Sequence, residues 1–257
     1  MSASPRFLAN GDTVMVVEFG EGIDLKTSSQ VTALATYINS LGLNGINDLV
    51  PTFRSLAIHY DPSYLSFNIL EEIVRTTLPD LKVNHHGRRE WLIPTFYDPQ
   101  MSPDLMEVAE RCSLSIEEVI SLHSQVAYHV YMIGFLPGFP YLGGLASKIS
   151  LPRKETPSLR IPERSVAIAE RMTAIYPNES PGGWYAIGRT PMTFFDPLNN
   201  PPALLAPGDQ VRFKPIKRDE FDHLSDQSEH LAEQDLSLIH ISEPTRPRLI
   251  SYAVFCL

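Results

Sequence analysis

Three arginines in the second half of the chain stand beside glycines and prolines that restrict the backbone. Arg153 and Arg160 lie in a proline-rich segment, residues 152–162, and Arg189 lies between a glycine and a Thr-Pro pair. The guanidinium group carries a planar fork of donors that matches a carboxylate or a phosphate. We therefore expect these arginines to bind an anionic substrate or a nucleotide. The alternative for each is that it caps backbone carbonyls or pairs with a surface acid.

A stretch of glycines, prolines and aromatic residues in the middle of the chain is a second candidate for a binding site. Its proposed ligand-contacting residues are Gly134, Phe135, Pro137, Gly138, Phe139 and Tyr141. Such a segment costs stability unless its aromatic side chains pack inward and hold it rigid. One interpretation is a buried apolar corner. Because a plain connection needs far fewer glycines and prolines, we favour a ligand wall or a docking ridge.

A second turn, residues 180–184, adds Gly182, Gly183 and Trp184 to the candidate binding residues. No complete catalytic set accompanies them. The chain has no Walker-type phosphate loop, no Gly-x-Ser-x-Gly elbow and no His-Glu-x-x-His zinc motif. We therefore leave the catalytic residues unassigned, expect no metal site, and expect the chain to be inactive on its own.

The composition limits the classes of partner. Lys and Arg number 21 against 30 Asp and Glu, an acidic balance that argues against nucleic acid. No run is long and apolar enough to cross a membrane, and the N-terminus lacks a signal-peptide pattern. The two cysteines, Cys112 and Cys256, make a disulfide framework improbable. We expect a soluble cytoplasmic protein.

The first 84 residues predict a ferredoxin-like α/β domain. Strands are expected at residues 13–19, 46–51 and 55–60, with a fourth near 81–83. Helical periodicity follows Thr27 or Ser28, either of which can act as the cap, and a second helix follows Ser66. The resulting βαββαβ order is that of a split ferredoxin-like unit.

Residues 85–220 predict a second domain that is rich in short strands. Two short helices are expected after Ser102 and Ser115, and His123 is expected to be a satisfied histidine near a helix end. Strands are expected at residues 91–97, 128–133, 165–169, 173–176, 184–188, 193–195 and 210–213. This spacing indicates a barrel or a sandwich, so that the whole chain has an α+β fold. Residues 221–235 are expected to form a polar tail.

The last residues, 236–257, differ in character from the rest of the chain. Two blocks of this stretch are what a transposon-type sequencing adapter would encode, with Pro247–Leu249 where an index barcode would fall. The alternative is a genuine amphipathic C-terminal strand. Because two matching blocks stand in the right order, we interpret residues 236–257 as an artefact and leave them out of the fold.

Several long motifs, taken in order, resemble a single family. They are residues 53–56, 59–62, 134–145, 175–177, 180–184 and 187–191. They resemble the B subunit of the bacterial ATP-dependent 5-oxoprolinases, also called the KipI or allophanate hydrolase subunit 1 family (carboxyltransferase subdomain C/D). The resemblance extends from about Arg6 to about Phe221. It departs from the family at Glu170, Arg171, Met172 and Ala174, where small or amide residues are usual.

The resemblance implies a fold, a cofactor and partners. The fold would be an N-terminal α/β domain followed by a cyclophilin-like β-barrel. The chain would form a tight complex with the C subunit, use ATP with its usual Mg²⁺ counter-ion, and work with the A subunit to hydrolyse 5-oxo-L-proline to L-glutamate. An alternative is a non-catalytic binding module that inhibits a sensor histidine kinase. Prolyl isomerase activity would rest on fold analogy alone.

Overall fold

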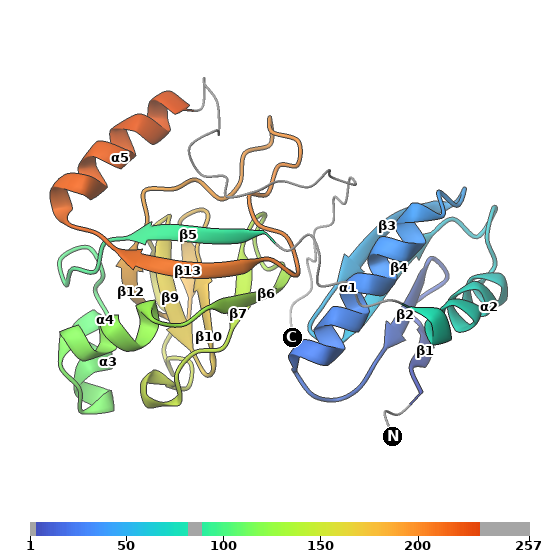
Figure 1. Ribbon diagram of the computed structural model, residues 1–257, viewed down its shortest axis with the longest axis horizontal. Helices are drawn as coiled ribbons and strands as arrows, with labels where there is room; N and C mark the ends of the chain where they lie inside the picture. Colours follow the sequence, from blue (N-terminus) through green and yellow to red (C-terminus); the bar gives the residue numbers. More distant parts are fainter. Residues whose placement is uncertain (1–3, 82–88, 232–257) are drawn as a thin grey trace.

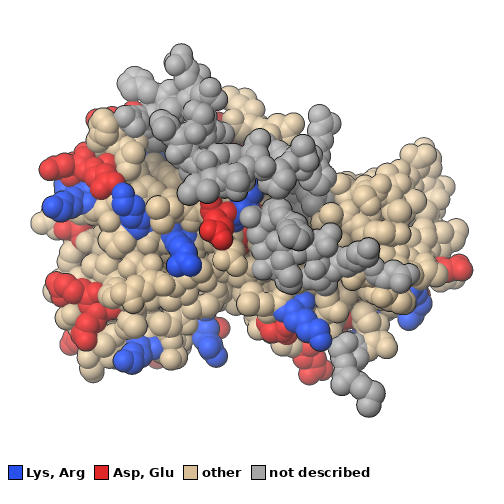
Figure 2. All heavy atoms as spheres, viewed as in Figure 1, with Lys and Arg blue, Asp and Glu red and all other residues tan. Residues whose placement is uncertain are grey.

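The computed structural model describes residues 4–81 and 89–231 and shows two large sheets that lie side by side (Figure 1). The predicted boundary between the domains, at residues 84 and 85, lies outside the described residues, as does the stretch interpreted as an adapter. On the face drawn in Figure 2, acidic and basic side chains are interspersed over the barrel. Among the described residues, no helix has the length and apolar character needed to span a bilayer.

The first sheet has four antiparallel strands in the order β1-β2-β4-β3. They are β1 (Arg6–Ala9), β2 (Val14–Glu18), β3 (Ile46–Pro51) and β4 (Ser55–Tyr60). The helices α1 (Leu25–Ser40) and α2 (Phe67–Thr77) pack against it around one apolar core, and a short 3-10 helix, Leu78–Asp80, follows α2. The strands predicted at 46–51 and 55–60 are confirmed to the residue.

The first sheet has a strand that was not predicted, β1, and residues 82 and 83 of the strand expected near 81–83 lie outside the described residues. Leu81 lies outside any strand, and the edge beside β2 is occupied by β1. The hairpin is favoured because only a short turn separates the two strands, closed by a 2.9 Å hydrogen bond from Asn10 N to Val14 O. The predicted cap of α1 is also wrong. The cap is Asp24, whose carboxylate accepts a 2.9 Å hydrogen bond from Thr27 N.

The second sheet has seven strands in the order β12-β9-β10-β7-β6-β13-β5 and closes into a barrel at one point. Its edge strands meet through Phe96 and Arg189, whose main-chain N···O distances are 2.8 and 2.9 Å. The strands are β5 (Glu90–Thr95), β6 (Tyr128–Ile133), β7 (Pro140–Gly143), β9 (Ser165–Ala169), β10 (Met172–Ile175), β12 (Tyr185–Arg189) and β13 (Gln210–Pro215). All pairs are antiparallel except β13 with β5.

Shorter elements surround the barrel. The helices α3 (Leu105–Cys112) and α4 (Ile116–Ser124) pack against its core, and a 3-10 helix, Ser147–Ile149, touches both. A two-stranded ribbon pairs β8 (Ser158–Ile161) with β11 (Ser180–Gly182). The last described helix, α5 (Arg218–Leu231), packs the buried Phe221 against Phe96, so the segment expected to be a polar tail begins inside a helix.

Two local predictions in the barrel half are wrong. Residues 193–195 form no strand, because Phe195 makes a single bridge, to Ala203. The helix α3 begins after Asp104 rather than Ser102, and Asp104 does not cap it. The Asp104 carboxylate instead accepts a 2.7 Å hydrogen bond from Ala186 N. The predicted capping box at Ser115 is confirmed, with Glu118 as its second member.

Candidate functional site

The loop between β6 and β7 consists of two tight turns in succession. The first is a γ-turn, since Leu136 N donates a 2.9 Å hydrogen bond to Gly134 O around Phe135, whose φ is +69°. The second is a β-turn with Pro137 and Gly138 at its centre, closed by a 3.0 Å bond from Phe139 N to Leu136 O; Gly138 has φ +78°. The loop is therefore a fixed structure rather than a slack connection.

Gly138 is required for its backbone conformation and for the space that it leaves. A Cβ at this position would lie 2.8 Å from the carbonyl oxygen of Phe194 and 2.7 Å from the Cβ of Phe195. The loop thus rests directly on the main chain of the 194–195 segment. Phe139 is buried, as predicted, but the Phe135 side chain is not: this residue is 44% exposed. The prediction that Phe135 packs inward is wrong, since its side chain lies partly in solvent at the first of the two turns.

The outer face of the barrel carries a cluster of aromatic rings over small residues. Successive residues of β9 point to opposite faces, so Val166 and Ile168 enter the main core while Ala167 and Ala169 line the outer face. The small side chains leave room for rings, which meet edge to face with centroids 5.0–6.0 Å apart. We call this cluster the outer aromatic face; its rings are those of Phe139, Tyr141, Tyr176 and Trp184.

The outer aromatic face brings together several of the predicted binding residues. A Cβ at Gly182 would clash with the hydroxyl of Tyr176, so the turn at residues 180–184 approaches this ring closely. Gly183 O accepts a 2.8 Å hydrogen bond from Lys154 N. Burial raises the pKa of Tyr176 above its ordinary value, so its phenol, which is already protonated at neutral pH, stays a hydrogen-bond donor at higher pH as well.

The three predicted arginines lie in three different settings. Arg153 is exposed, with its guanidinium 6.0 Å from the ring centroid of Trp184, so it borders the outer aromatic face. Arg160 is exposed and pairs with Glu179 at 2.7 Å. The Arg189 main chain closes the barrel, and its Nε donates a 3.1 Å hydrogen bond to Glu163 O. Burial lowers the pKa of Arg189. Of the three, Arg153 is the one placed beside the aromatic cluster.

A lysine that the sequence did not single out lies close to this face. Lys154 Nζ lies 2.6 Å from an oxygen of Asp104 and 2.9 Å from Ser158 Oγ, and its side chain is only 13% exposed. The ion pair links the segment before β8 to the start of α3, and it fixes the backbone from which Arg153 projects. Because Asp104 is 50 residues away in the sequence, no local pattern could have revealed this pair.

The first sheet meets the barrel beside the same face. The ring of Phe53, in the turn between β3 and β4, has its centroid 5.9 Å from that of Tyr131 and 5.5 Å from that of Tyr141. A second contact joins α1 to β6, where Ser28 Oγ lies 3.0 Å from His129 Nε2 in buried surroundings. Tyr141, one of the rings of the outer aromatic face, therefore touches both halves of the molecule.

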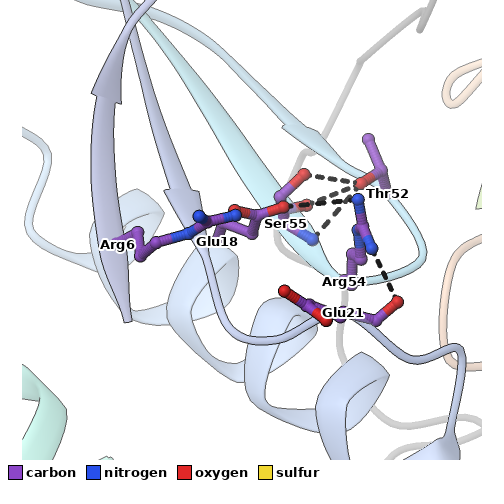
Figure 3. Close-up of polar contacts among 6 residues, drawn as sticks. All are labelled: Arg6, Glu18, Glu21, Thr52, Arg54 and Ser55. Carbon is purple, nitrogen blue, oxygen red and sulfur yellow. Dashed lines mark hydrogen bonds and ion pairs between the residues drawn. The ribbon is translucent and has the colours of Figure 1, made fainter. Parts of the chain in front are cut away.

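A network of polar contacts holds the turn that carries Phe53 (Figure 3). Glu18, 9% exposed, pairs with Arg6 from β1 and lies 3.4 Å from a guanidinium nitrogen of Arg54. Arg54 also donates a 2.6 Å hydrogen bond to Glu21 O. The hydroxyls of Thr52 and Ser55 meet at 2.8 Å across the turn. These contacts hold the turn from both sides, and they therefore hold the ring of Phe53 at its tip.

His123 is a satisfied core residue, as predicted. Its Nδ1 lies 2.7 Å from the hydroxyl of Tyr97 and its Nε2 lies 2.9 Å from Thr173 Oγ1. Burial lowers its pKa from 6.5 to about 3, so it is neutral at physiological pH. Within residues 4–81 and 89–231, no group of three acidic, histidine or cysteine side chains is arranged to hold a metal ion.

Comparison with known proteins gives a consistent result over most of the chain. Residues 5–205 match the family model of the carboxyltransferase domain, subdomain C and D. The B subunit of 5-oxoprolinase from Bacillus subtilis is 39% identical over 229 residues, which cover 85% of this chain and 95% of that protein. The B subunit of the Escherichia coli O157:H7 enzyme is 35% identical over 208 residues, covering 80% and 94% of the two chains.

Solved structures have the same fold. Protein PH0987 of Pyrococcus horikoshii aligns at a TM-score of 0.51 and 38% identity, covering 84% of this chain and all of that one. TTHA0988 aligns at 0.72 and 38% identity, but this chain spans only 40% of its length and is itself covered to 79%. Urea carboxylase of Kluyveromyces lactis, at 0.69 and 19% identity, shares the fold over 87% of this chain and 23% of its own. The chain therefore belongs to the carboxyltransferase subdomain C and D family, and within it to the B subunits of the 5-oxoprolinases.

Proposed function

We propose that this chain is the B subunit of an ATP-dependent 5-oxoprolinase and works with the A and C subunits to hydrolyse 5-oxo-L-proline to L-glutamate. The observation that carries the proposal is the match to three relatives named as the B subunit of 5-oxoprolinase, at 35–39% identity over 93–95% of their lengths. All three carry the name of an enzyme subunit, so we prefer this function to inhibition of a histidine kinase. Two finer assignments are part of the same proposal: a cyclophilin-like barrel and a variant ferredoxin-like first sheet.

The chemistry of a lactam explains why ATP is needed. Transfer of the γ-phosphoryl group to the amide oxygen releases ADP and turns that oxygen into a leaving group. Water then adds to the activated carbon and the C–N bond of the ring breaks, which leaves an acyl phosphate. A second water hydrolyses this acyl phosphate to the carboxylate of glutamate and inorganic phosphate. ATP with Mg²⁺ and 5-oxoproline are both anionic, so a cation that borders an aromatic surface is a suitable contact for either of them.

We place the contribution of this chain at the outer aromatic face. Arg153 projects beside Trp184, on a backbone that is fixed by the ion pair of Lys154 with Asp104. Fixing the base of a long side chain lowers the entropy that it loses on gripping an anion. Arg160 and Arg189 have protein partners already. In this proposal they support the structure, and Arg153 binds the carboxylate or the phosphate.

Reconstitution tests the function and the site together. The purified chain alone should not hydrolyse 5-oxoproline with ATP, and adding the A and C subunits should restore turnover. In that complex, Arg153→Lys should lower kcat/KM by roughly ten- to a hundredfold, since a charged hydrogen bond is worth about 1.5–3 kcal/mol. Arg160→Lys is the matched control and should have no effect. Turnover by the chain alone would contradict its role as one part of a larger enzyme, and an intact Arg153→Lys complex would contradict the site.

A further inference from the structure

Phe135 is held in a backbone conformation that disfavours a bulky side chain. Its φ of +69° and the γ-turn around it belong to a rare and strained class of turn. Three other described residues besides glycine have positive φ, and local structure accounts for each. Ser113 ends α3, Glu170 lies in the turn between β9 and β10, and Arg164 lies in the turn before β9 that is closed by a 3.3 Å hydrogen bond from Ser165 N to Pro162 O. Nothing local requires an aromatic ring at position 135.

The strain holds the ring of Phe135 partly in solvent. Phe135 is 44% exposed, whereas Phe139 and Tyr176, which support its ring at centroid distances of 5.3 and 6.4 Å, are each 1% exposed. Both neighbours belong to the outer aromatic face. An apolar ring on a rigid loop, supported by buried rings, loses little conformational entropy when it binds a partner. This is the usual setting of an aromatic anchor in a protein interface.

The side chains around Phe135 favour a protein over a small molecule as the partner of this ring. Leu159 on β8 is 88% exposed, and Ile161, two residues further along the same strand, is buried in the cluster that supports Phe135. Exposed apolar side chains thus lie next to Phe139, Tyr176 and Ile161, whereas Arg153 borders the cluster at Trp184. Exposed apolar side chains suit an apolar pocket in a partner protein. This chain also spans only 40% of the TTHA0988 chain, so in that relative the unit is joined to further protein.

We propose that Phe135 is the anchor through which this chain binds its companion, the C subunit of the enzyme, by inserting its ring into an apolar pocket of that protein. The inference rests on the proposed function, because that function supplies the partner. It also explains why the strained backbone holds a phenylalanine: a glycine would relieve the turn but remove the anchor. Strain and binding can therefore be separated by mutation.

The test measures affinity for the purified C subunit of 5-oxoprolinase by titration calorimetry, together with thermal melts. Phe135→Ala removes the ring and keeps the strain, whereas Phe135→Gly removes both. We expect Phe135→Gly to melt at a higher temperature than Phe135→Ala. We expect both to bind this partner at least roughly thirtyfold more weakly than the wild type, as for an anchor residue. The control is Glu170→Gly, which relieves a positive φ of 52° at an exposed site and should leave affinity unchanged.

Each other outcome of the titration leads to a different conclusion about Phe135 and the proposed function. If the wild type binds the C subunit, and both Phe135 variants bind it within twofold of the wild type, the anchor is wrong and the proposed function stands. If the wild type itself does not bind, both proposals are overturned. If affinity for this partner is unchanged but the KM of the complex for 5-oxoproline rises, the ring faces the small molecule, and the protein-docking role is overturned.

Discussion

At the scale of single residues, His123 makes the stability of the barrel depend on pH. Its pKa is about 3 in the folded protein, against an ordinary value of 6.5. The unfolded chain therefore binds the proton more readily, so the stabilising effect of the neutral ring is complete above about pH 6.5 and is lost as the pH falls toward 3. Each pH unit in this window should lower the free energy of unfolding by about 1.4 kcal/mol.

Urea denaturation at pH 7 and at pH 5.5 measures this effect. His123→Gln provides the comparison, since an amide can hydrogen-bond to the same neighbours, Tyr97 and Thr173, without titrating. The variant should lose about 1.4 kcal/mol less than the wild type between the two pH values. Equal losses in the two proteins would show that His123 is not the group responsible.

The sequence indicated which residue types could bind an anion but could not rank them. Arg153, Arg160 and Arg189 stand beside similar turns in the sequence, and only the folded chain shows that two of them have acceptors from Glu179 and Glu163. Those acceptors are 19 and 26 residues away. Pairing over such distances depends on strand register, which composition and spacing do not specify.

At the scale of elements, the β6–β7 loop depends on one glycine. Gly138→Ala should lower the free energy of unfolding by about 2–3 kcal/mol, because a side chain at φ +78° is strained and its Cβ would press on the main chain at Phe194. Gly183→Ala is the matched control. Its Cβ would find no atom closer than 3.7 Å, so the change should stay within about 0.5 kcal/mol. Chemical denaturation of both variants checks the prediction, which an unperturbed Gly138→Ala protein would contradict.

Element types were more predictable than element edges. The tight turn at residues 52 and 53 located β3 and β4, and the Ser115 capping box located α4. The β6 strand shows what alternation misses. A shift in register between Val130 and Met132 places Ile133 in the same core as Tyr128 and Val130, although strict alternation predicts the opposite face. A bulge is set by the partner strand and leaves no signal in its own sequence.

At the scale of the whole molecule, Phe53 couples the two sheets. Its ring makes two contacts across the junction, and an aromatic pair contributes about 0.5–1.5 kcal/mol. Phe53→Ala should therefore weaken the coupling by about 1–3 kcal/mol and split one calorimetric transition into two. Tyr64→Ala, which removes a ring that is 70% exposed on the same half of the chain, should leave the transition single. A single transition in Phe53→Ala would mean that the contact at Ser28 and His129 suffices.

The pairing of the barrel's first and last strands determines how the unit can be joined to other proteins. Because β5 and β13 run parallel over six paired residues, the strand pair begins at Glu90 and ends at Pro215, at opposite ends of the pair and about 17 Å apart. A module with this in-line geometry suits tandem fusion, with a neighbour on each side. It is poorly suited to insertion into a surface loop of a host, which would have to bring both ends together.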